Sequence, residues 1–247
     1  MKTTNNHYDK IANKYNSLWL FSEDYIQWYL KNVERLLEIQ QNDVVADIGG
    51  GTGLFGSELH KNANLKNNIV CVEPSEKMCS IADCLRDVEV MHDTADAFFK
   101  KGNEQGISKI LMKEMIHHIP DRKKLFKDIY SFLNKGSVLI ATREKEIEFP
   151  FFKKALQEFS DSQDDYHIFI QELEDAGFSI SVEVVPYQMK ISSRFWEEAI
   201  RNRFMSHLSS FTSEEIEEGI NELRESNPQG QDYIFYDNLV FIQGKKR

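Results

Sequence analysis

The chain has 247 residues, which suits one large α/β domain or one domain that carries an insertion. Its formal net charge of -10, from 40 acidic and 30 basic side chains, opposes binding to phosphate backbones and disfavours nucleic acid as a partner. The sequence has no apolar run of about 20 residues, and its three cysteines lack metal-ligand spacing, so we expect a cytoplasmic protein with no membrane partner.

The first forty residues combine helical spacing with many aromatic side chains. Between residues 9 and 38 this pattern predicts helices that lie over the rest of the domain. A short apolar segment at 44–48 follows and leads directly into the glycine-rich stretch 49–53. That order is typical of a buried strand that enters a tight turn.

Apolar strand segments then alternate with helical segments. Strands are predicted at 69–72, 88–91, 109–112 and 138–142, and helices at 54–61, 76–85 and 122–133. Strands that alternate with helices of this length need crossover connections, which favour a mostly parallel sheet with helices on both faces. We therefore expect a doubly wound, Rossmann-like α/β fold.

The last third of the chain departs from this alternation. A helix is predicted at 163–176, a strand at 182–191 and a final, antiparallel strand at 238–243, which brings the sheet to seven strands. Between the last two strands, residues 193–225 predict one or two polar helices, with Thr212 or Ser213 as a helix cap. We expect residues 1–247 to form a single domain, in which residues 1–40 and the insertion 193–225 cap the active site.

A carboxylate at the carboxyl end of the first strand leads into three glycines in the pattern Asp47-x-Gly49-x-Gly51-x-Gly53. Glycines let the backbone pass close to a ligand, and Glu73 at the end of the second strand suits a ribose, whose two hydroxyls one carboxylate can bind. The turn also matches a dinucleotide fingerprint, so an NAD(P)-dependent oxidoreductase is an alternative. Asp47 argues against it, because this carboxylate would repel a pyrophosphate but attract the ammonium group of a methionyl moiety.

Four stretches of the chain resemble the class I S-adenosylmethionine-dependent methyltransferases, in particular the small-molecule enzymes related to the ubiquinone-biosynthesis methyltransferases. The stretches are residues 45–53, 72–78, 93–97 and 115–121, in the family's order and approximate spacing. The resemblance implies S-adenosyl-L-methionine as the cofactor and a small molecule as the methyl acceptor. A non-catalytic partner subunit that keeps the cofactor site is a further alternative.

The same resemblance implies which residues bind the cofactor. The glycines line its methionyl and ribose portion, Met78 packs near the adenine, and residues 93–95 form the adenine loop. The segment 7–15 looks like one that folds over the cofactor in relatives, although its tyrosines could instead only pin a helix to the domain. The expected cofactor residues are Tyr8, Tyr15, Asp47, Gly49, Gly51, Gly53, Glu73, Pro74, Met78, Asp93, Thr94, Ala95 and Lys113.

Candidate catalytic residues follow the strand at 109–112. A neutral imidazole on His117 would serve as a general base near pH 7, Glu114 would orient an amine, and His118 is a further candidate. A base is optional, because in-line methyl transfer depends mainly on orientation, and the two histidines could instead only begin the next helix. Adjacent histidines lack the i, i+4 spacing of a metal-binding pair, so we expect no metal site.

Aromatic and basic residues outside these motifs are candidates for the acceptor pocket. Aromatic side chains would enclose an apolar or cationic acceptor, and arginines would bind a carboxylate or a phosphate. The candidates are Trp19, Phe149, Phe152, Arg194, Trp196 and Arg203. For those in the insertion, the alternative is an amphipathic helix with a solvated basic face. Whether the acceptor atom is oxygen, nitrogen or carbon is left open, because one fold serves many acceptors.

Overall fold

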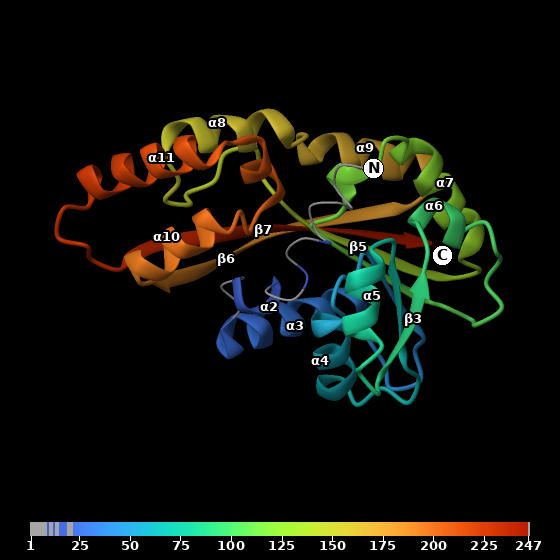
Figure 1. Ribbon diagram of the computed structural model, residues 1–247. Helices are drawn as coiled ribbons and strands as arrows, with labels where there is room; N and C mark the ends of the chain where they lie inside the picture. Colours follow the sequence, from blue (N-terminus) through green and yellow to red (C-terminus); the bar gives the residue numbers. More distant parts are fainter. Residues whose placement is uncertain (1–8, 10–11, 13–14, 19–21, 247) are drawn as a thin grey trace.

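The computed structural model describes residues 9, 12, 15–18 and 22–246. In this part of the chain, seven strands form one sheet in the order β3-β2-β1-β4-β5-β7-β6 (Figure 1). They are β1 (Val45–Ile48), β2 (Ile69–Glu73), β3 (Val88–His92), β4 (Lys109–Lys113), β5 (Gly136–Arg143), β6 (Ser179–Ile191) and β7 (Tyr233–Lys246). Neighbouring strands from β3 to β5 are parallel, whereas β7 runs antiparallel to both β5 and β6. The predicted doubly wound, seven-stranded sheet with an antiparallel last strand is confirmed.

Helices cover both faces of this sheet (Figure 1). One face carries α3 (Glu23–Leu37), α4 (Leu54–Asn62) and α5 (Glu76–Ala82), and the other carries α6 (Ala95–Phe98), α7 (Arg122–Phe132) and α9 (Tyr166–Ala176). On α3 the buried residues Tyr29, Val33 and Leu37 recur at every fourth position, and the helix packs against β5. This helix, predicted as part of a cap, therefore belongs to the layer that covers the sheet.

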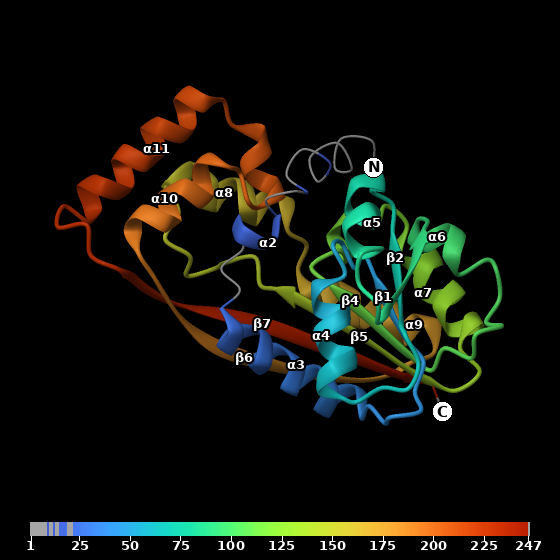
Figure 2. The ribbon, with the colours of Figure 1, turned by 60° about the horizontal axis from the view of Figure 1, so that its bottom comes forward.

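The last two strands continue beyond the sheet as a two-stranded ribbon. β7 pairs with β5 only as far as Leu239, but it pairs with β6 as far as Tyr233 opposite Ile191. The ribbon carries α10 (Ser193–Arg201), η3 (Ser206–Ser210) and α11 (Ser213–Ser226), and α8 (Lys153–Ser162) packs beside η3 (Figure 2). We call these four elements the cap. The predicted helical insertion between the last two strands is thus present, and Thr212 caps α11 as one of the two expected residues.

An aromatic cluster joins the cap to the ribbon. Trp196 of α10 has no exposed surface, and the centroid of its ring lies 5.5 Å from that of Phe235 on β7 and 5.1 Å from that of Phe151. Its indole N–H donates to the carbonyl of Pro150 at 2.6 Å. Full burial of a large apolar side chain contributes about 1.5–3 kcal/mol, so this cluster anchors the cap firmly.

The helix predicted at 163–176 begins later in the structure. Asp165 caps α9 by accepting the N–H of His167 at 2.9 Å, and α8 ends at Ser162. Between them Gln163 is extended and buried, and its side-chain amide donates to Thr142 Oγ1 at 3.0 Å. This hydrogen bond to β5 holds Gln163 in the connection between α8 and α9 instead of in a helix.

Among the helices described, none has the length and apolar character that crossing a bilayer demands.

Candidate active site

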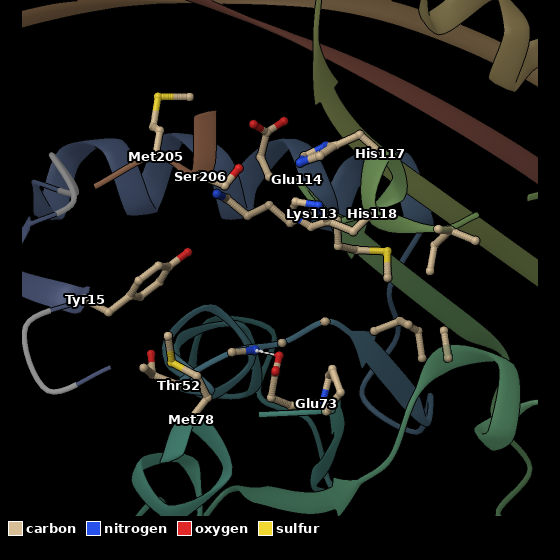
Figure 3. Close-up of a pocket in the computed structure, with 18 of the residues that line it drawn as sticks. Tyr15, Thr52, Glu73, Met78, Lys113, Glu114, His117, His118, Met205 and Ser206 are labelled. Carbon is tan, nitrogen blue, oxygen red and sulfur yellow. Dashed lines mark hydrogen bonds between the residues drawn. The ribbon is translucent and has the colours of Figure 1, made fainter. Parts of the chain in front are cut away.

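A cavity of about 570 Å³ lies at the carboxyl ends of β1, β2 and β4. In the sheet, β1 lies between β2 and β4, so the chain departs to one side of β1 and later returns on its other side. Open α/β sheets bind ligands at such a switch point, and small-molecule sites usually measure about 300–1,000 Å³. The lining also includes residues of α2 (Tyr15–Leu18), η2 (Ile116–His118) and the cap (Figure 3).

The glycine turn forms one side of the pocket, because its backbone adopts conformations that favour glycine. Gly49, Gly51 and Gly53 have φ angles of 71°, 58° and 74°. A Cβ on Gly49 would lie 2.9 Å from the Cβ of Met115. A Cβ on Gly51, in contrast, would meet no heavy atom within 4 Å apart from its chain neighbours. Gly51 lines the pocket, so this open space is available to a ligand.

Two buried carboxylates flank the turn. Glu73 Oε2 accepts the N–H of Gly51 at 3.0 Å (Figure 3), and its Oε1 accepts the N–H of Ser75 at 2.8 Å. Burial raises the pKa of Glu73, and these two hydrogen bonds oppose the rise. Burial also raises the pKa of Asp47, to about 7, although the nearby charge of Lys113 opposes it. The backbone thus holds Glu73 in one orientation before any ligand arrives.

Helix caps position the neighbouring residues on this side. Ser75 caps α5 by accepting the N–H of Met78 at 3.2 Å, and Thr94 caps α6. Met78 and Thr94 therefore reach the pocket from two helix starts at the same edge of the sheet. We define the glycine-turn wall as Asp47, Gly49, Gly51, Glu73 and Met78.

The short helix α2 borders the glycine turn at one end of the pocket. Tyr15 and Asn16 both line the cavity. The hydroxyl of Thr52, in the glycine turn, donates to Asn16 Oδ1 at 2.7 Å. This hydrogen bond fastens α2 to the turn, and it places Tyr15 beside the cavity (Figure 3).

Across the pocket, Glu114 follows β4 in a left-handed conformation with φ 52°. Its backbone N–H donates to the carbonyl of Ala141 at 2.8 Å. Its Oε2 binds the guanidinium of Arg143, whereas Oε1 is buried and has no hydrogen-bond partner among the described residues. Left-handed residues other than glycine persist only where the surroundings hold them, and they cluster at functional sites.

A buried ion network holds Glu114 from behind. Arg143 donates to both carboxylate oxygens of Asp237, at 2.7 and 2.8 Å, and the hydroxyl of Tyr25 donates to Asp237 at 3.0 Å. The side chain of Arg143 is 1% exposed. Burial raises the pKa of Glu114, and the charge of Arg143 opposes the rise. The network thereby fixes the carboxylate of Glu114 at the edge of the cavity.

Lys113 precedes Glu114 and also lines the cavity. Its Nζ lies 4.6 Å from the ring centroid of Phe55 and 5.5 Å from that of Tyr29. Burial lowers the pKa of Lys113 to about 8, and the carboxylate of Glu114 opposes this. The ammonium group is therefore largely charged at pH 7, where aromatic rings and nearby carboxylates stabilise it.

Two imidazoles lie on the same side as Glu114. Burial lowers the pKa of His117 to about 4 and that of His207, from η3, to about 3, so both are neutral at pH 7. The ring of His207 meets Phe151 and Phe159 edge-on, at centroid distances of 5.2 and 5.3 Å. His117 Nδ1 and His207 Nε2 are buried without a hydrogen-bond partner in the part of the chain described. We define the cap-side wall as Glu114, His117, Phe159, Met205 and His207.

Most residues predicted for the cofactor and for catalysis line this one cavity. They are Tyr15, Asp47, Gly49, Gly51, Glu73, Pro74, Met78, Thr94, Ala95, Lys113, Glu114, His117 and His118. Separate segments of the sequence thus meet at one edge of the sheet. The individual roles of these residues stay predictions.

Two predicted cofactor residues lie behind the lining. A Cβ on Gly53 would lie 3.0 Å from Leu85 and 3.2 Å from Ala82, so this glycine allows α5 to approach. Asp93 accepts the N–H of Thr94 at 3.0 Å and pairs with Lys101 at 2.6 Å. The predicted Tyr8 and Trp19 lie outside the described residues.

The structure does not bring the described acceptor-pocket candidates to the cavity. Phe149, Phe152 and Trp196 are buried in the hydrophobic core, where they pack the cap. Arg194 is exposed on α10, and Arg203 donates to a backbone carbonyl of the cap at 3.1 Å. The aromatic side chains of this segment are therefore used for packing, and its arginines lie away from the cavity.

The cap region supplies lining residues that were not predicted, among them Phe159, Met205 and His207. Phe159 follows the buried Ala155 by four residues on α8, which is a helical signal that the sequence does contain. His207 is a single histidine without a partner at a recognisable spacing. Among the described residues there is no group of three or more His, Cys, Asp or Glu side chains arranged to hold a metal ion.

Comparisons with known proteins agree with this architecture. A family model described as a methyltransferase domain matches residues 21–218. The curated phosphoethanolamine N-methyltransferase 3 of Arabidopsis thaliana is 25% identical over 195 residues, which are 74% of this chain and 38% of that protein. The chain therefore spans well under half the length of this relative.

Solved structures share the fold at low sequence identity. A protein described as a methyltransferase of an antibiotic biosynthesis pathway in Anabaena variabilis matches with a TM-score of 0.70 and 16% identity, over 87% of this chain and 96% of that chain. Phosphoethanolamine N-methyltransferase 2 of Haemonchus contortus, in complex with S-adenosyl-L-methionine, matches with a TM-score of 0.61 and 20% identity, over 96% and 57%. None of these matches singles out the ubiquinone-biosynthesis type. Because the family model covers most of its length, the chain belongs to the methyltransferase domain family, which confirms the predicted class I S-adenosylmethionine-dependent methyltransferase.

Proposed function

We propose that this protein transfers the methyl group of S-adenosyl-L-methionine to a small-molecule acceptor bound at the cap-side wall. One observation carries the proposal. A single cavity is lined on one side by the glycine turn with Glu73 and on the other by polar side chains from β4, η2 and η3. Family membership also disfavours the nicotinamide oxidoreductase that the glycine turn alone allowed.

The glycine-turn wall fits the cofactor chemically. Each oxygen of Glu73 accepts one backbone N–H and keeps a lone pair for a ribose hydroxyl. Asp47 offers a carboxylate to the ammonium group of the methionyl tail, and the open space at Gly51 admits the ligand. The bound cofactor supplies an electrophilic methyl group on a positively charged sulfur.

The protein's own contribution is orientation and exclusion of water. Phe159 and Met205 present apolar surface to the cavity from the cap, and Tyr15 borders it at the other end. When a site holds two reactants in a well-oriented pair, proximity lowers the activation barrier by about 7–11 kcal/mol. No strong base is required for this part of the rate enhancement.

We assign His117 to hydrogen bonding with the acceptor rather than to proton removal. Burial lowers the pKa of His117 to about 4, so the imidazole binds a proton only weakly at pH 7. Its buried Nδ1 has no partner among the described residues, which suits contact with a bound molecule. Glu114, whose pKa is raised by burial, is the stronger candidate for accepting a proton.

We further propose a small acceptor and a cytoplasmic location. The cavity volume and its carboxylates support a small acceptor rather than a nucleic acid. The thiols of Cys71, Cys79 and Cys84 are unpaired, which supports the cytoplasm as the compartment. We propose the same methyl transfer as the activity of the full protein in the cell.

Calorimetry of the purified chain with S-adenosylhomocysteine and, separately, with NADH tests the cofactor. We expect one molecule of S-adenosylhomocysteine to bind per chain and NADH not to bind. Transfer of a labelled methyl group to any small molecule then separates an enzyme from a non-catalytic subunit. Binding of NADH in place of S-adenosylhomocysteine would refute the proposed function.

A further inference from the structure

The cap-side wall contains three buried polar atoms that lack hydrogen-bond partners among the described residues. They are Glu114 Oε1 and His117 Nδ1, which follow β4, and His207 Nε2, which comes from η3. All three residues line the same cavity. An unsatisfied buried polar group costs about 1–3 kcal/mol, so three of them on one wall indicate groups that a ligand satisfies.

The described lining of this cavity has an excess of acidic side chains. Among the described lining residues there are four carboxylates, those of Asp47, Glu73, Glu114 and Glu158, but one ammonium group, that of Lys113, and no arginine. The lining therefore carries an excess of negative charge even when Asp47 is protonated. An anionic acceptor would be repelled, whereas a cation would be attracted.

In the part of the chain that the structure describes, the positive charges nearest to the cap-side wall are already balanced. Arg143 binds both oxygens of Asp237 as well as Glu114, and it does not line the cavity. Lys113 lies over the ring of Phe55, with carboxylates around it. Neither side chain is arranged to receive a phosphate or a carboxylate from the acceptor.

We propose that the methyl acceptor is an amine without a phosphate or carboxylate in the part that enters the cavity, and that its nitrogen binds the free oxygen of Glu114. The inference rests on the proposed function and names its acceptor class. The neutral imidazoles of His117 and His207 line the same chamber and contribute hydrogen bonds without adding charge. Phe159 supplies an aromatic surface against which a cation packs favourably.

The step balances with the groups present. The ammonium ion of the acceptor first passes one N–H proton to the carboxylate of Glu114, which frees the lone pair of the nitrogen. This lone pair forms the new bond to the methyl carbon, while the methyl–sulfur bond breaks and its electron pair stays on sulfur. The product leaves as a methylated ammonium ion, and Glu114 releases its proton to water. Glu114 thus acts as a catalytic residue that both orients the amine and receives its proton.

The acceptor class that we propose differs from that of the phosphoethanolamine methyltransferases, which this chain resembles. Their named acceptor carries a phosphate, which would face the excess of carboxylates in this cavity. We therefore expect ethanolamine to react with a kcat/KM at least tenfold above that of phosphoethanolamine, although both present the same amine.

The test uses benzylamine, benzyl alcohol and benzyl phosphate, which share one ring and differ in charge. Initial rates are measured on the full chain with labelled S-adenosyl-L-methionine, together with the ethanolamine pair. We expect a kcat/KM for benzylamine at least tenfold above those of the alcohol and the phosphate. If no compound turns over, their dissociation constants in the presence of S-adenosylhomocysteine must show the same order. An alcohol or a phosphate that is preferred, or an absence of preference, overturns the inference.

Variants at Glu114 test the assigned contact. Glu114→Gln removes the charge and should reduce the amine preference at least tenfold, with binding of S-adenosylhomocysteine retained. Glu114→Asp keeps the charge and tolerates the left-handed backbone, so it should retain part of the preference. Glu214→Gln, at an exposed position of α11, is the matched control. A preference for the amine that survives Glu114→Gln overturns the inference. Failure of the wild-type protein to bind S-adenosylhomocysteine would instead refute the proposed function itself.

Discussion

The glycine-turn wall and the cap-side wall differ in how their polar groups are satisfied. On the glycine-turn wall, both oxygens of Glu73 already accept backbone N–H groups. On the cap-side wall, Glu114, His117 and His207 each keep a buried atom without a partner among the described residues. The first wall is therefore preorganised by the main chain, and the second depends on a ligand and on a supporting network of side chains.

That dependence predicts the largest effect at Asp237, which supports Glu114 through Arg143. Asp237→Asn leaves a buried guanidinium without its main counter-charge, and breaking such a buried pair costs about 3–5 kcal/mol of the free energy of unfolding. Chemical denaturation measures this loss. Asp232→Asn is the control, because Asp232 is exposed and its pairing with Lys190 at 3.6 Å should contribute about 0–1 kcal/mol. Equal losses in the two variants would refute the network.

The glycine-turn wall predicts the next effect, which concerns binding rather than stability. Gly51→Val adds a side chain to the open space and strains a backbone with φ 58°, so the affinity for S-adenosylhomocysteine should fall about 100-fold, or about 2.7 kcal/mol. Gly106→Val is a matched control, with φ 71° and equally open surroundings but no place in the cavity lining. Calorimetry of both variants would contradict the assignment if they bound the ligand equally well.

Asp47 predicts a smaller, pH-dependent effect on the same wall. Burial raises the pKa of Asp47 to about 7, and a bound ammonium group favours its charged form, so binding should release a proton. The affinity for S-adenosylhomocysteine should therefore rise, by up to about tenfold, as the pH increases from 6 to 8. Asp47→Asn should flatten this dependence. A profile that is identical in wild type and variant would show that Asp47 does not face the ammonium group.

Without ligand, the sign of the Asp47 effect on stability is the opposite. Its folded pKa lies above the ordinary value of 3.8, so its contribution is fully present below that value and is lost as the pH rises through about 7. Wild type should therefore lose stability relative to Asp47→Asn between about pH 4 and pH 7. Thermal unfolding of the ligand-free proteins measures the difference.

The smallest predicted effect on stability distinguishes Tyr25 from Tyr29, which lie one helical turn apart on α3. The hydroxyl of Tyr25 donates to Asp237 at 3.0 Å, whereas that of Tyr29 is buried without a hydrogen-bond partner among the described residues. Tyr25→Phe should cost about 1 kcal/mol of the free energy of unfolding, and Tyr29→Phe should cost nothing. Denaturation midpoints that fall equally would contradict the network at Asp237.

The glycine-turn wall could be predicted from the sequence, because its residues follow apolar strands at short distances along the chain. Asp47 is the next-to-last residue of β1 and Glu73 ends β2, and parallel strands bring their carboxyl ends to one edge of the sheet. The order of strands and helices was likewise readable from the alternation of apolar segments. Local signals were sufficient for this half of the site.

The cap-side wall could not be predicted in the same way. His207 and Glu114 line one cavity only because the β6–β7 ribbon extends past the sheet and carries η3 to the pocket. Arg143 on β5 forms an ion pair with Asp237 on β7, and no spacing in the sequence predicts that contact. Trp196 and Phe149 were predicted to line the acceptor pocket because they are aromatic, but in the structure they pack in the hydrophobic core beneath the cap. These assignments depend on tertiary packing, which local patterns do not encode.

The central claim is that the cofactor binds the glycine-turn wall and presents its sulfur to an acceptor at the cap-side wall, and a crystal structure with S-adenosylhomocysteine tests it most directly. The account predicts ribose hydroxyls at Glu73, the amino-acid tail at Asp47 and the sulfur facing the side of the cavity that holds Glu114 and His117. A ligand bound elsewhere, or one whose sulfur points away from the cap-side wall, would contradict it.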